Sequence, residues 1–583
     1  MTFCFCTVAF SSKTMAQTYD PVAVSVINDL IDNNGLIGYA KDDPDTWDFA
    51  EWDESSPMQL IVLDFYSVDI FHLTGTVSFA GLTNLEYLDC WYNNISALDL
   101  TGCSKLEFLD CALNNLTQLN VSDLTSLEEM YCYDNNLTQL SVSGLTSLEY
   151  LDCSENNLSQ LNVNGCIKLM ELDCSKNNLS QLDVSGLTNL EYLLCSRNNL
   201  VQLDVSGLSN LEYLYCYENN LTQLNVNGCI NLMELDCYEN NLTQLNVNGC
   251  INLIALDCEE NNLSQLDVSG LTNLEYLLCS DNNLTQLNVS GCTNLMALGC
   301  NENSLTQLNI SDLTNLIQLN CGENNLTQLD ISDLTDLVFL ACYSNNLTQL
   351  NVSDLINLLY LDCEENFLTE LNVSNCNYLE ELFCAGNNLT QLDVSGLANL
   401  EYLTCYENHL IALDLTGLNY LTYFWGDYQS VSLALQESTA GQYTCNISLN
   451  NPTFDENAIS YSSGVLTSNN NAITSTDFSV ETGKSGYQLS GTMYFTYGPV
   501  NISEIVRNEK VHVYPNPTTE QLKITNYENG SIAIFDVAGR NVGTYSFGRL
   551  ENTGNEISID VSYLSAGIYF LRIDGKMVKF VKE

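Results

Sequence analysis

Tyrosine and carboxylate side chains recur at fixed distances from a cysteine that is itself repeated along the chain. Counted from that cysteine, aromatic residues gather at positions −3 and +1, and acids at positions −1 and +2. Tyrosine offers a large contact area at a small entropic cost, and binding interfaces are enriched in it. These positions, termed the strand face below, therefore predict a recognition surface. We expect its densest part to comprise Tyr192, Tyr213, Tyr215, Tyr217 and Tyr238, with Glu218 and Glu239 beside them.

Other interpretations of the same residues stay open. Tyrosine also suits an exposed β-strand, and acids can simply keep a surface solvated. The acids could instead attract basic partners, or bind Ca²⁺ through carboxylate and asparagine oxygens. Position +7, by contrast, is Gln in thirteen of sixteen repeats. Variation on one face and near-constancy on the other favours the recognition surface.

Catalytic chemistry is not indicated. The sequence lacks the nucleophile-elbow, zinc-protease, phosphate-loop and dinucleotide-binding motifs. Its three histidines, His72, His409 and His512, are far apart in sequence. Paired carboxylates occur in nearly every repeat, so their presence says little about glycosidase chemistry. We therefore expect no catalytic residues, no metal ligands and no cofactor, and an enzyme is the least favoured class.

The charge of the chain excludes one class of partner and permits a large core. The 583 residues include 73 acids and 16 bases, which gives a net charge of −57. Such a polyanion repels phosphate, so nucleic-acid binding is not expected. Apolar residues make up 45% of the chain, enough to bury a sizeable core. No apolar run reaches the roughly 18 residues that a membrane-spanning helix needs.

A 21-residue repeat must position the strand face. Cysteine recurs sixteen times from Cys90 to Cys405, and an Asn follows each cysteine three positions later, from Asn93 to Asn408. The Leu-x-Cys alternation predicts short parallel strands with Leu and Cys inward. The Asn side chain is suited to satisfy backbone groups of the neighbouring coil. About ten residues remain for the return, too few for a stable helix, so we expect an extended convex side with a second short strand at Leu119–Val121.

The structural ladder is thus predicted to contain two rows of side chains. Its first members are Cys90, Cys111, Cys132 and Cys153 in one row, and Asn93, Asn114, Asn135 and Asn156 in the other.

This pattern resembles the leucine-rich repeat family. Leu148, Leu151, Cys153, Asn156 and Leu158 match its L-x-x-L-x-L-x-x-N-x-L core, with Cys in place of the third Leu. The resemblance covers residues 60–426 and includes sixteen regular coils with a degenerate coil at each end, as the ends of solenoids require. It implies a curved solenoid that recognises proteins on its strand side.

The 25 cysteines are expected to be buried thiols that pack as small hydrophobes. Sixteen belong to the 21-residue row. Six more share another phase, thirteen positions later: Cys103, Cys166, Cys229, Cys250, Cys292 and Cys376. A metal site would need paired cysteines or histidine partners, and disulfides between in-register parallel strands would be strained.

The charge distribution marks a separate C-terminal domain. From Lys510 to Glu583, eight bases balance eight acids, so the whole net charge lies upstream. This segment resembles the type A sorting domain of the Bacteroidetes type IX secretion system, which implies export across the outer membrane and handling by that machinery. The residues that carry the resemblance are Tyr514, Pro515, Asn516, Pro517, Gly539, Gly567, Tyr569 and Lys579. We expect residues 509–583 to form a β-sandwich.

The remaining segments are assigned from local pattern. Residues 1–17 are similar to a secretory signal peptide. Residues 18–59 are expected to cap the solenoid, with a helix at 20–34 whose N-cap is Asp20 and whose end precedes Gly35. Residues 427–500 lose the repeat but alternate as strands, which predicts a small all-β module, and residues 501–508 are a linker.

Together these features predict a mainly β protein, secreted or held at the outer-membrane surface. The strand face is expected to bind or adhere to an extracellular protein. The alternative is a structural or Ca²⁺-dependent adhesin that binds glycans.

Overall fold

The computed structural model describes most of the chain. The described residues are 18–36, 38–65, 73–439, 442–456, 458–498, 512–514, 521–525, 530–535, 541–547, 556–573 and 576–582. The signal peptide expected at 1–17 and the linker expected at 501–508 lie outside them. The chain divides into two units, one of residues 1–405 with 416–425, the other of residues 406–415 with 426–583.

The first unit begins with a helical cap. Helix α1 (Pro21–Asn34) starts at Asp20, whose carboxylate accepts a hydrogen bond from the Val22 amide at 3.2 Å, and it ends at Gly35 in a left-handed conformation. Its apolar face is buried. Strand β1 (Ala50–Trp52) then pairs antiparallel with β2 (Leu60–Asp64), the first strand of the solenoid. This pairing covers what would otherwise be an open sheet edge.

Each following coil adds one short strand to a single 19-stranded sheet. Its further strands are β4 (Tyr87–Asp89), β6 (Phe108–Asp110), β7 (Glu129–Tyr131), β9 (Tyr150–Asp152), β11 (Glu171–Asp173), β12 (Tyr192–Leu194), β14 (Tyr213–Tyr215), β16 (Glu234–Asp236), β17 (Ala255–Asp257), β19 (Tyr276–Leu278), β21 (Ala297–Gly299), β22 (Gln318–Asn320), β23 (Phe339–Ala341), β24 (Tyr360–Asp362), β25 (Glu381–Phe383), β26 (Tyr402–Thr404) and β27 (Tyr423–Trp425).

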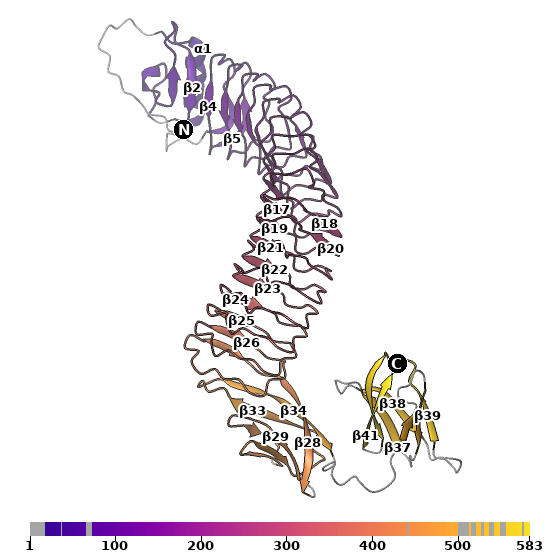
Figure 1. The fold of residues 1–583 in the computed structure, drawn as a ribbon. Coiled ribbons are helices and arrows are strands. Elements are labelled where there is room, and N and C mark those ends of the chain that lie inside the picture. The colour runs from indigo at the N-terminus through magenta and orange to yellow at the C-terminus, as the bar shows by residue number, and fades with distance from the viewer. Residues whose placement is uncertain are drawn as a thin grey trace. The chain divides into compact units, whose positions relative to one another are not determined.

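The sheet is parallel from β2 onward, and its register equals the repeat. Tyr192 pairs with Tyr213, and Leu193 with Leu214, the equivalent positions of two successive coils. The leucine at −2 and the cysteine at 0 point inward and are fully buried in almost every coil. Figure 1 shows these strands side by side along one side of the solenoid. The prediction of a mainly β, parallel solenoid with an extended convex side is confirmed.

Within the described coils, short strands also pair on the convex side between particular neighbours, and an isolated bridge joins Asn351 and Asn372. Strand β3 (Thr74–Ser78) pairs with β5 (Asn94–Asp99), β8 (Gln139–Ser141) with β10 (Gln160–Asn162), β13 (Gln202–Asp204) with β15 (Gln223–Asn225), and β18 (Gln265–Asp267) with β20 (Gln286–Asn288). The pairs that start at Gln139, Gln202 and Gln265 follow one another at intervals of three coils.

Paired glycines allow these strands to approach. Gly144 and Gly165 both have positive φ, and a Cβ on Gly165 would lie 3.4 Å from the Cα of Gly144. In the second coil of the pair, Cys166 donates its thiol proton to the carbonyl oxygen of Val142 at 3.2 Å. The same Gly–Cys arrangement recurs at Cys103, Cys229 and Cys292.

The second strand expected at Leu119–Val121 is therefore wrong for that coil. Position +12 there is Asp123, and the left-handed glycine that allows close approach is absent. Where convex strands do form after β5, they begin at the Gln of position +7, one position earlier than expected.

The second unit contains a seven-stranded sheet in residues 429–498. Its order is β30 (Thr453–Phe454), β33 (Ser475–Glu481), β34 (Gln488–Gly498), β28 (Gln429–Thr439), β29 (Gln442–Asn446), β32 (Val465–Ser468) and β31 (Ile459–Ser462). The long central strands β28 and β34 run parallel and pair Val431 with Met493. Val431, Leu435, Phe478 and Met493 are buried within it.

The C-terminal segment forms two further sheets. One has the order β35 (His512–Tyr514), β36 (Gln521–Thr525), β39 (Glu556–Asp560), and the other β38 (Asn541–Phe547), β37 (Gly530–Phe535), β40 (Gly567–Ile573), β41 (Lys576–Lys582). Leu522 and Ile559 from the first sheet share one core with Ile534, Leu571 and Phe580 from the second. Two sheets around one core make a β-sandwich.

Candidate recognition face on the solenoid strands

The five candidate tyrosines lie in three adjacent coils, and four of them form two stacks. The rings of Tyr192 and Tyr213 are 4.7 Å apart between centroids, with an interplanar angle of 4°. Tyr217 and Tyr238 are 4.8 Å apart at 10°. Both stacks follow from the register, which sets equivalent residues of successive coils side by side at about the 4.8 Å strand spacing. All five side chains are half-buried at the surface of the sheet.

The fifth tyrosine, Tyr215, belongs to neither stack. It pairs across the sheet with Leu194 and Asp236. Burial raises the pKa of Tyr215, and the carboxylate of Glu234 raises it further. Its hydroxyl therefore stays protonated at neutral pH and can donate a hydrogen bond.

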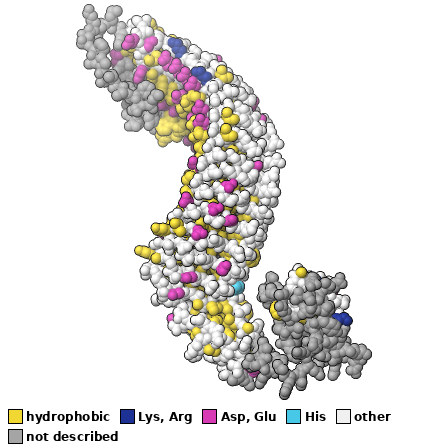
Figure 2. Space-filling model, in the orientation of Figure 1, with side chains coloured by type: hydrophobic (Ala, Val, Ile, Leu, Met, Phe, Trp, Pro, Cys, Tyr) yellow, Lys and Arg dark blue, Asp and Glu magenta, His cyan; other side chains and the backbone are white. Residues whose placement is uncertain are grey.

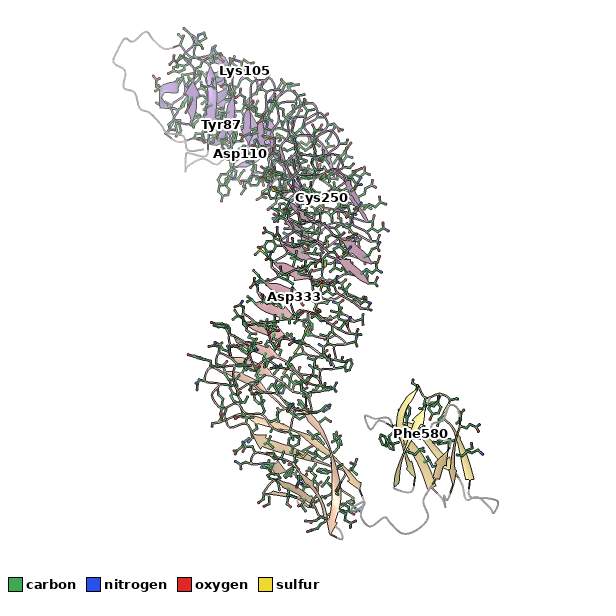
Figure 3. All side chains as sticks on the ribbon, in the orientation of Figure 1. Tyr87, Lys105, Asp110, Cys250, Asp333 and Phe580 are labelled. Carbon is green, nitrogen blue, oxygen red and sulfur yellow. The ribbon has the colours of Figure 1, made fainter. Side chains whose placement is uncertain are left out.

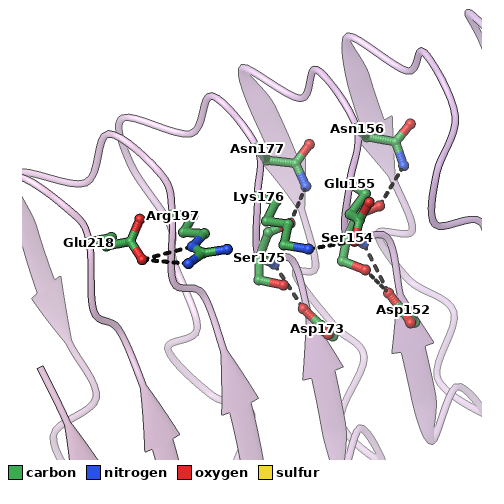
Figure 4. A network of polar contacts seen from close by, with 10 residues as sticks. All are labelled: Asp152, Ser154, Glu155, Asn156, Asp173, Ser175, Lys176, Asn177, Arg197 and Glu218. Atoms are coloured by element: carbon green, nitrogen blue, oxygen red, sulfur yellow. Dashed lines mark hydrogen bonds and ion pairs between the residues drawn. The ribbon is translucent and has the colours of Figure 1, made fainter.

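The two candidate glutamates differ in their surroundings. Glu218 accepts hydrogen bonds from Arg197 Nε at 2.8 Å and from the Tyr238 hydroxyl at 3.1 Å. Its pKa is lowered, chiefly by the hydrogen bond from Arg197. Burial, followed by the hydrogen bond to Glu218, raises the pKa of Tyr238 to about 12. Glu239 is exposed. Figure 4 shows the pair of Arg197 and Glu218 next to that of Lys176 and Glu155.

The acids at position −1 form a row that is partly withdrawn from solvent. Asp152 accepts hydrogen bonds from the Ser154 amide at 2.9 Å and its hydroxyl at 2.7 Å, so it closes the turn after the strand (Figure 4). Burial raises its pKa to about 6, with a contribution from Asp173. Burial likewise raises the pKa of Asp110 to about 7 (Figure 3).

The residue at +2 projects from a left-handed turn in each regular coil. Its φ is 50° at Glu218 and 52° at Glu239, a conformation that costs a non-glycine residue on the order of 1 kcal/mol. The turn aims this side chain away from the core. The side chains at position +2, termed the +2 column below, therefore line one edge of the strand face.

Beneath the strand face, each ladder Asn joins two coils. Asn114 Nδ2 donates to the carbonyl oxygens of Cys111 in its own coil at 3.1 Å and Cys90 in the preceding coil at 3.0 Å. Its Oδ1 accepts from the amide of Ile95 at 2.9 Å. Asn135 and Asn156 make the same contacts, and Asn93 accepts from Leu73 at 2.7 Å. The four ladder cysteines, Cys90, Cys111, Cys132 and Cys153, are free thiols with no exposed surface.

The sequence analysis missed one further rung. Gln429 stands one repeat after Asn408, and its Oε1 accepts from the Leu410 amide at 2.8 Å while its Nε2 donates to the Gly426 carbonyl at 3.1 Å. The 21-residue spacing was the available signal. Gln departs from the Asn pattern, so the repeat alone does not indicate this rung.

Further aromatic contacts lie on the same face outside the predicted set. Phe339 and Tyr360 stack at 4.4 Å, and Tyr87 and Phe108 do so at 4.4 Å. Aromatic residues at position −3 of two successive coils indicate both stacks.

Beside the strands, a hollow of about 380 Å³ is lined by apolar Met233 and Ile254 and by a row of asparagines.

The sorting-motif residues fall partly outside the described structure. Tyr514 lies in β35, Gly567 and Tyr569 in β40, and Lys579 in β41. Tyr569 packs on Phe580 at 5.6 Å between ring centroids. Pro515, Asn516, Pro517 and Gly539 lie outside the described residues.

Of the histidines, His409 contacts the Ser430 carbonyl oxygen, His512 lies in β35, and His72 is outside the described residues. Among the described side chains, no group of three or more His, Cys, Asp or Glu is placed to hold a metal ion. No helix in the described ranges is long and apolar enough to cross a membrane.

Comparison with known families identifies the C-terminal segment. Residues 512–583 match the family described as the secretion system C-terminal sorting domain. This segment is a type IX sorting domain. The sorting domain directs the chain to the cell surface or to secretion, and the predicted localisation is confirmed.

Solved structures identify the architecture of the solenoid. The functional domain of InlJ from Listeria monocytogenes, which includes a cysteine ladder, is 28% identical with a TM-score of 0.58, over 73% of this chain and 91% of that chain. The solenoid is a leucine-rich repeat array. YopM from Yersinia enterocolitica WA-314 is 24% identical with a TM-score of 0.46, over 61% of this chain and 87% of that one. A comparison with curated proteins gives no match.

Proposed function

We propose that this exported leucine-rich repeat protein binds an extracellular protein through its strand face, and that the tyrosine stacks provide the anchor. The observation that carries the proposal is the pair of stacks, Tyr192 with Tyr213 and Tyr217 with Tyr238. These rings cover the outside of a sheet whose inner side is already filled by leucine and cysteine, so folding does not require them. The role is one of binding and adhesion without catalysis.

Magnitudes favour the aromatic residues over the acids as anchors. A tyrosine buried in an interface contributes ~2 kcal/mol or more, whereas an exposed carboxylate pair contributes ~0–1 kcal/mol and is screened by salt. The acids should instead govern how fast a partner associates and how that rate depends on salt.

Site-specific crosslinking tests the location. A photo-crosslinking residue replaces Tyr217 on the strand face or, as a matched control in the same coil, Gln223 in the convex strand β15. The full chain is exposed to surface proteins of the cells among which it is secreted. We expect one defined adduct from position 217 and none from position 223. Adducts that form only from position 223, or from the 427–500 module, would contradict the proposal.

The crosslinked partner then allows a quantitative comparison. Tyr215→Ala with Tyr217→Ala should weaken binding about 30-fold, which corresponds to ~2 kcal/mol. Glu218→Gln with Glu239→Gln should weaken it less than about fivefold, and Gln223→Ala with Gln244→Ala should have no effect. If a chelator abolishes binding while the tyrosine changes do not, the Ca²⁺-dependent adhesin that binds glycans replaces this proposal.

A further inference from the structure

One cation of the chain already sits against the tyrosine stack. Arg197 contacts Glu218 through two nitrogens, at 2.8 and 2.7 Å, and its guanidinium carbon lies 6.0 Å from the centroid of the Tyr217 ring. That distance is within the range of a cation–π interaction. Tyr238 stacks against Tyr217 from the following coil. Arg197, Tyr217 and Tyr238 thus form a column, termed the cation–tyrosine column below, across three successive coils.

The other end of the cation–tyrosine column lacks a cation. The next coil carries Glu259 and Glu260 at the positions that Tyr238 and Glu239 occupy in their own coil. Asp236 and Asp257 pair with each other on neighbouring strands, two positions before Tyr238 and Glu259. Glu239 and Glu260 therefore stand in the +2 column beside the end at Tyr238, as Glu218 stands beside Tyr217, whereas the carboxylate of Glu259 extends the other way, toward Gly299.

The chain has no base of its own to place there. No lysine or arginine occurs between Arg197 and Lys484 in the sequence. Over the same stretch, the +2 column reads Glu218, Glu239, Glu260, Asp281, Glu302 and Glu323 in six consecutive coils. In Figure 2 the visible Lys and Arg side chains of the solenoid lie near its N-terminal end, whereas Asp and Glu are spread along it. Charge complementarity therefore favours a cation supplied from outside this stretch of the chain.

We propose that the end of the cation–tyrosine column formed by Tyr238, Glu239 and Glu260 binds an arginine side chain of the partner protein. The proposal rests on the proposed function and narrows it to partners that present arginine in an accessible segment. Arginine is favoured over lysine because its planar guanidinium can stack on a ring and, at the same time, pair with carboxylates in its own plane. Arg197 shows both contacts within the chain itself.

Two peptides of equal charge test the chemistry. Fluorescent (Arg-Gly)₄ and (Lys-Gly)₄ are titrated against the full chain at low and at physiological salt. Diffuse attraction to a polyanion would give the two peptides equal affinities. A cation–π contact that is stronger for arginine by ~1 kcal/mol gives the arginine peptide an affinity about fivefold higher. We expect that preference to persist at physiological salt.

Matched variants locate the site. Tyr238→Ser should remove the preference for arginine, and the fold tolerates serine at +1, since Ser154, Ser175 and Ser196 stand there in other coils. Glu239→Gln with Glu260→Gln should weaken both peptides more than Asp312→Asn with Asp333→Asn, which removes the same charge from exposed convex positions. Arg197→Ser should increase arginine-peptide binding, because it frees the ring of Tyr217 and the carboxylate of Glu218.

Three results would overturn the inference: equal affinity for the two peptides, an arginine preference unchanged by Tyr238→Ser, or no binding of either peptide. These results would not by themselves contradict the proposed function, because protein binding by the strand face does not depend on arginine recognition. A partner crosslinked at position 217 that presents no arginine to Tyr238 would leave strand-face binding intact and remove only this inference.

Discussion

The thiol of Cys229 donates a hydrogen bond to the carbonyl oxygen of Val205 in the preceding coil, with 3.2 Å between sulfur and oxygen. The ladder thiol of Cys237 is equally buried but makes no such contact among the described residues. Cys229 and Cys237 therefore differ in what a hydroxyl group would meet, although Cys258, Cys279 and Cys384 of the ladder row do donate to carbonyl oxygens.

Serine substitution should destabilise the protein to different extents at Cys229 and Cys237. Cys237→Ser should lower the free energy of unfolding by about 1–3 kcal/mol, because a hydroxyl without a partner is buried in an apolar stack. Cys229→Ser should lower it less, because the Val205 carbonyl can accept from the new hydroxyl. Urea unfolding followed by circular dichroism measures both. Equal losses would mean that the thiol of Cys229 contributes only packing.

The Asn ladder predicts that alanine substitution destabilises the protein far more at Asn240 than at the adjacent Asn241. Asn240 Nδ2 donates to the carbonyls of Cys216 and Cys237 at 3.1 Å each, and its Oδ1 accepts from the Leu221 amide at 2.9 Å. Asn240→Ala leaves these buried groups unpaired and should destabilise the protein by about 2–4 kcal/mol. Asn241→Ala, at an exposed position, should change stability by less than ~0.5 kcal/mol. Similar thermal midpoints for the two variants would contradict this role.

The aspartates at −1 predict that the protein is more stable in mild acid than at pH 8. The pKa of Asp236 is raised to about 7, first by burial and then by Asp257, whereas an aspartate in the unfolded chain titrates near 3.9. Between about pH 4 and 7 the folded state therefore binds a proton that the unfolded state does not. Stability falls as pH rises through this window.

A single substitution tests this relation. Asp236→Asn should flatten the pH dependence between 5 and 8 by about 1 kcal/mol, discounted because the site is partly solvated. The fold tolerates asparagine at −1, since Asn320 Oδ1 accepts a hydrogen bond from the Gly322 amide at 3.2 Å in another coil. Below about pH 4 the trend should reverse, because hydrogen bonds from Ser185 lower the pKa of Asp183. Thermal midpoints from pH 3 to 8 would show a maximum near pH 5, and a monotonic rise would refute the argument.

The sorting domain predicts where a truncated protein accumulates. Deletion of residues 512–583 in a host with the type IX system should leave the protein in the periplasm with its solenoid folded, because the deleted segment has its own core. A passive reporter fused between a signal peptide and residues 509–583 should reach the surface or the medium. Normal export of the truncated chain would show that the signal lies elsewhere.

The sequence predicted the structure best where a residue type recurs at a fixed spacing and can occupy only one kind of position in the fold. The 21-residue period predicted the register that pairs Tyr192 with Tyr213, and the invariant Asn indicated the inter-coil hydrogen bonds. The period could not reveal that Arg197 turns toward Tyr217, because that contact depends on side-chain rotamers. It also gave no sign of which coils pair on the convex side, since Gly186 has the same left-handed conformation as Gly144 and Gly165 but its coil forms no such pair.

The convex strand pairs give the solenoid a second, longer unit of construction. On the strand side every coil is equivalent, but on the convex side the pattern returns only at every third coil, from Gln139 to Gln202 to Gln265. A change in length by one coil between these pairs would keep the ladder of Asn114 and its equivalents intact while breaking the three-coil spacing of the convex strand pairs. Elongation or shortening by three coils preserves both patterns. Gene duplication in this array is thus compatible with the fold in blocks of three coils.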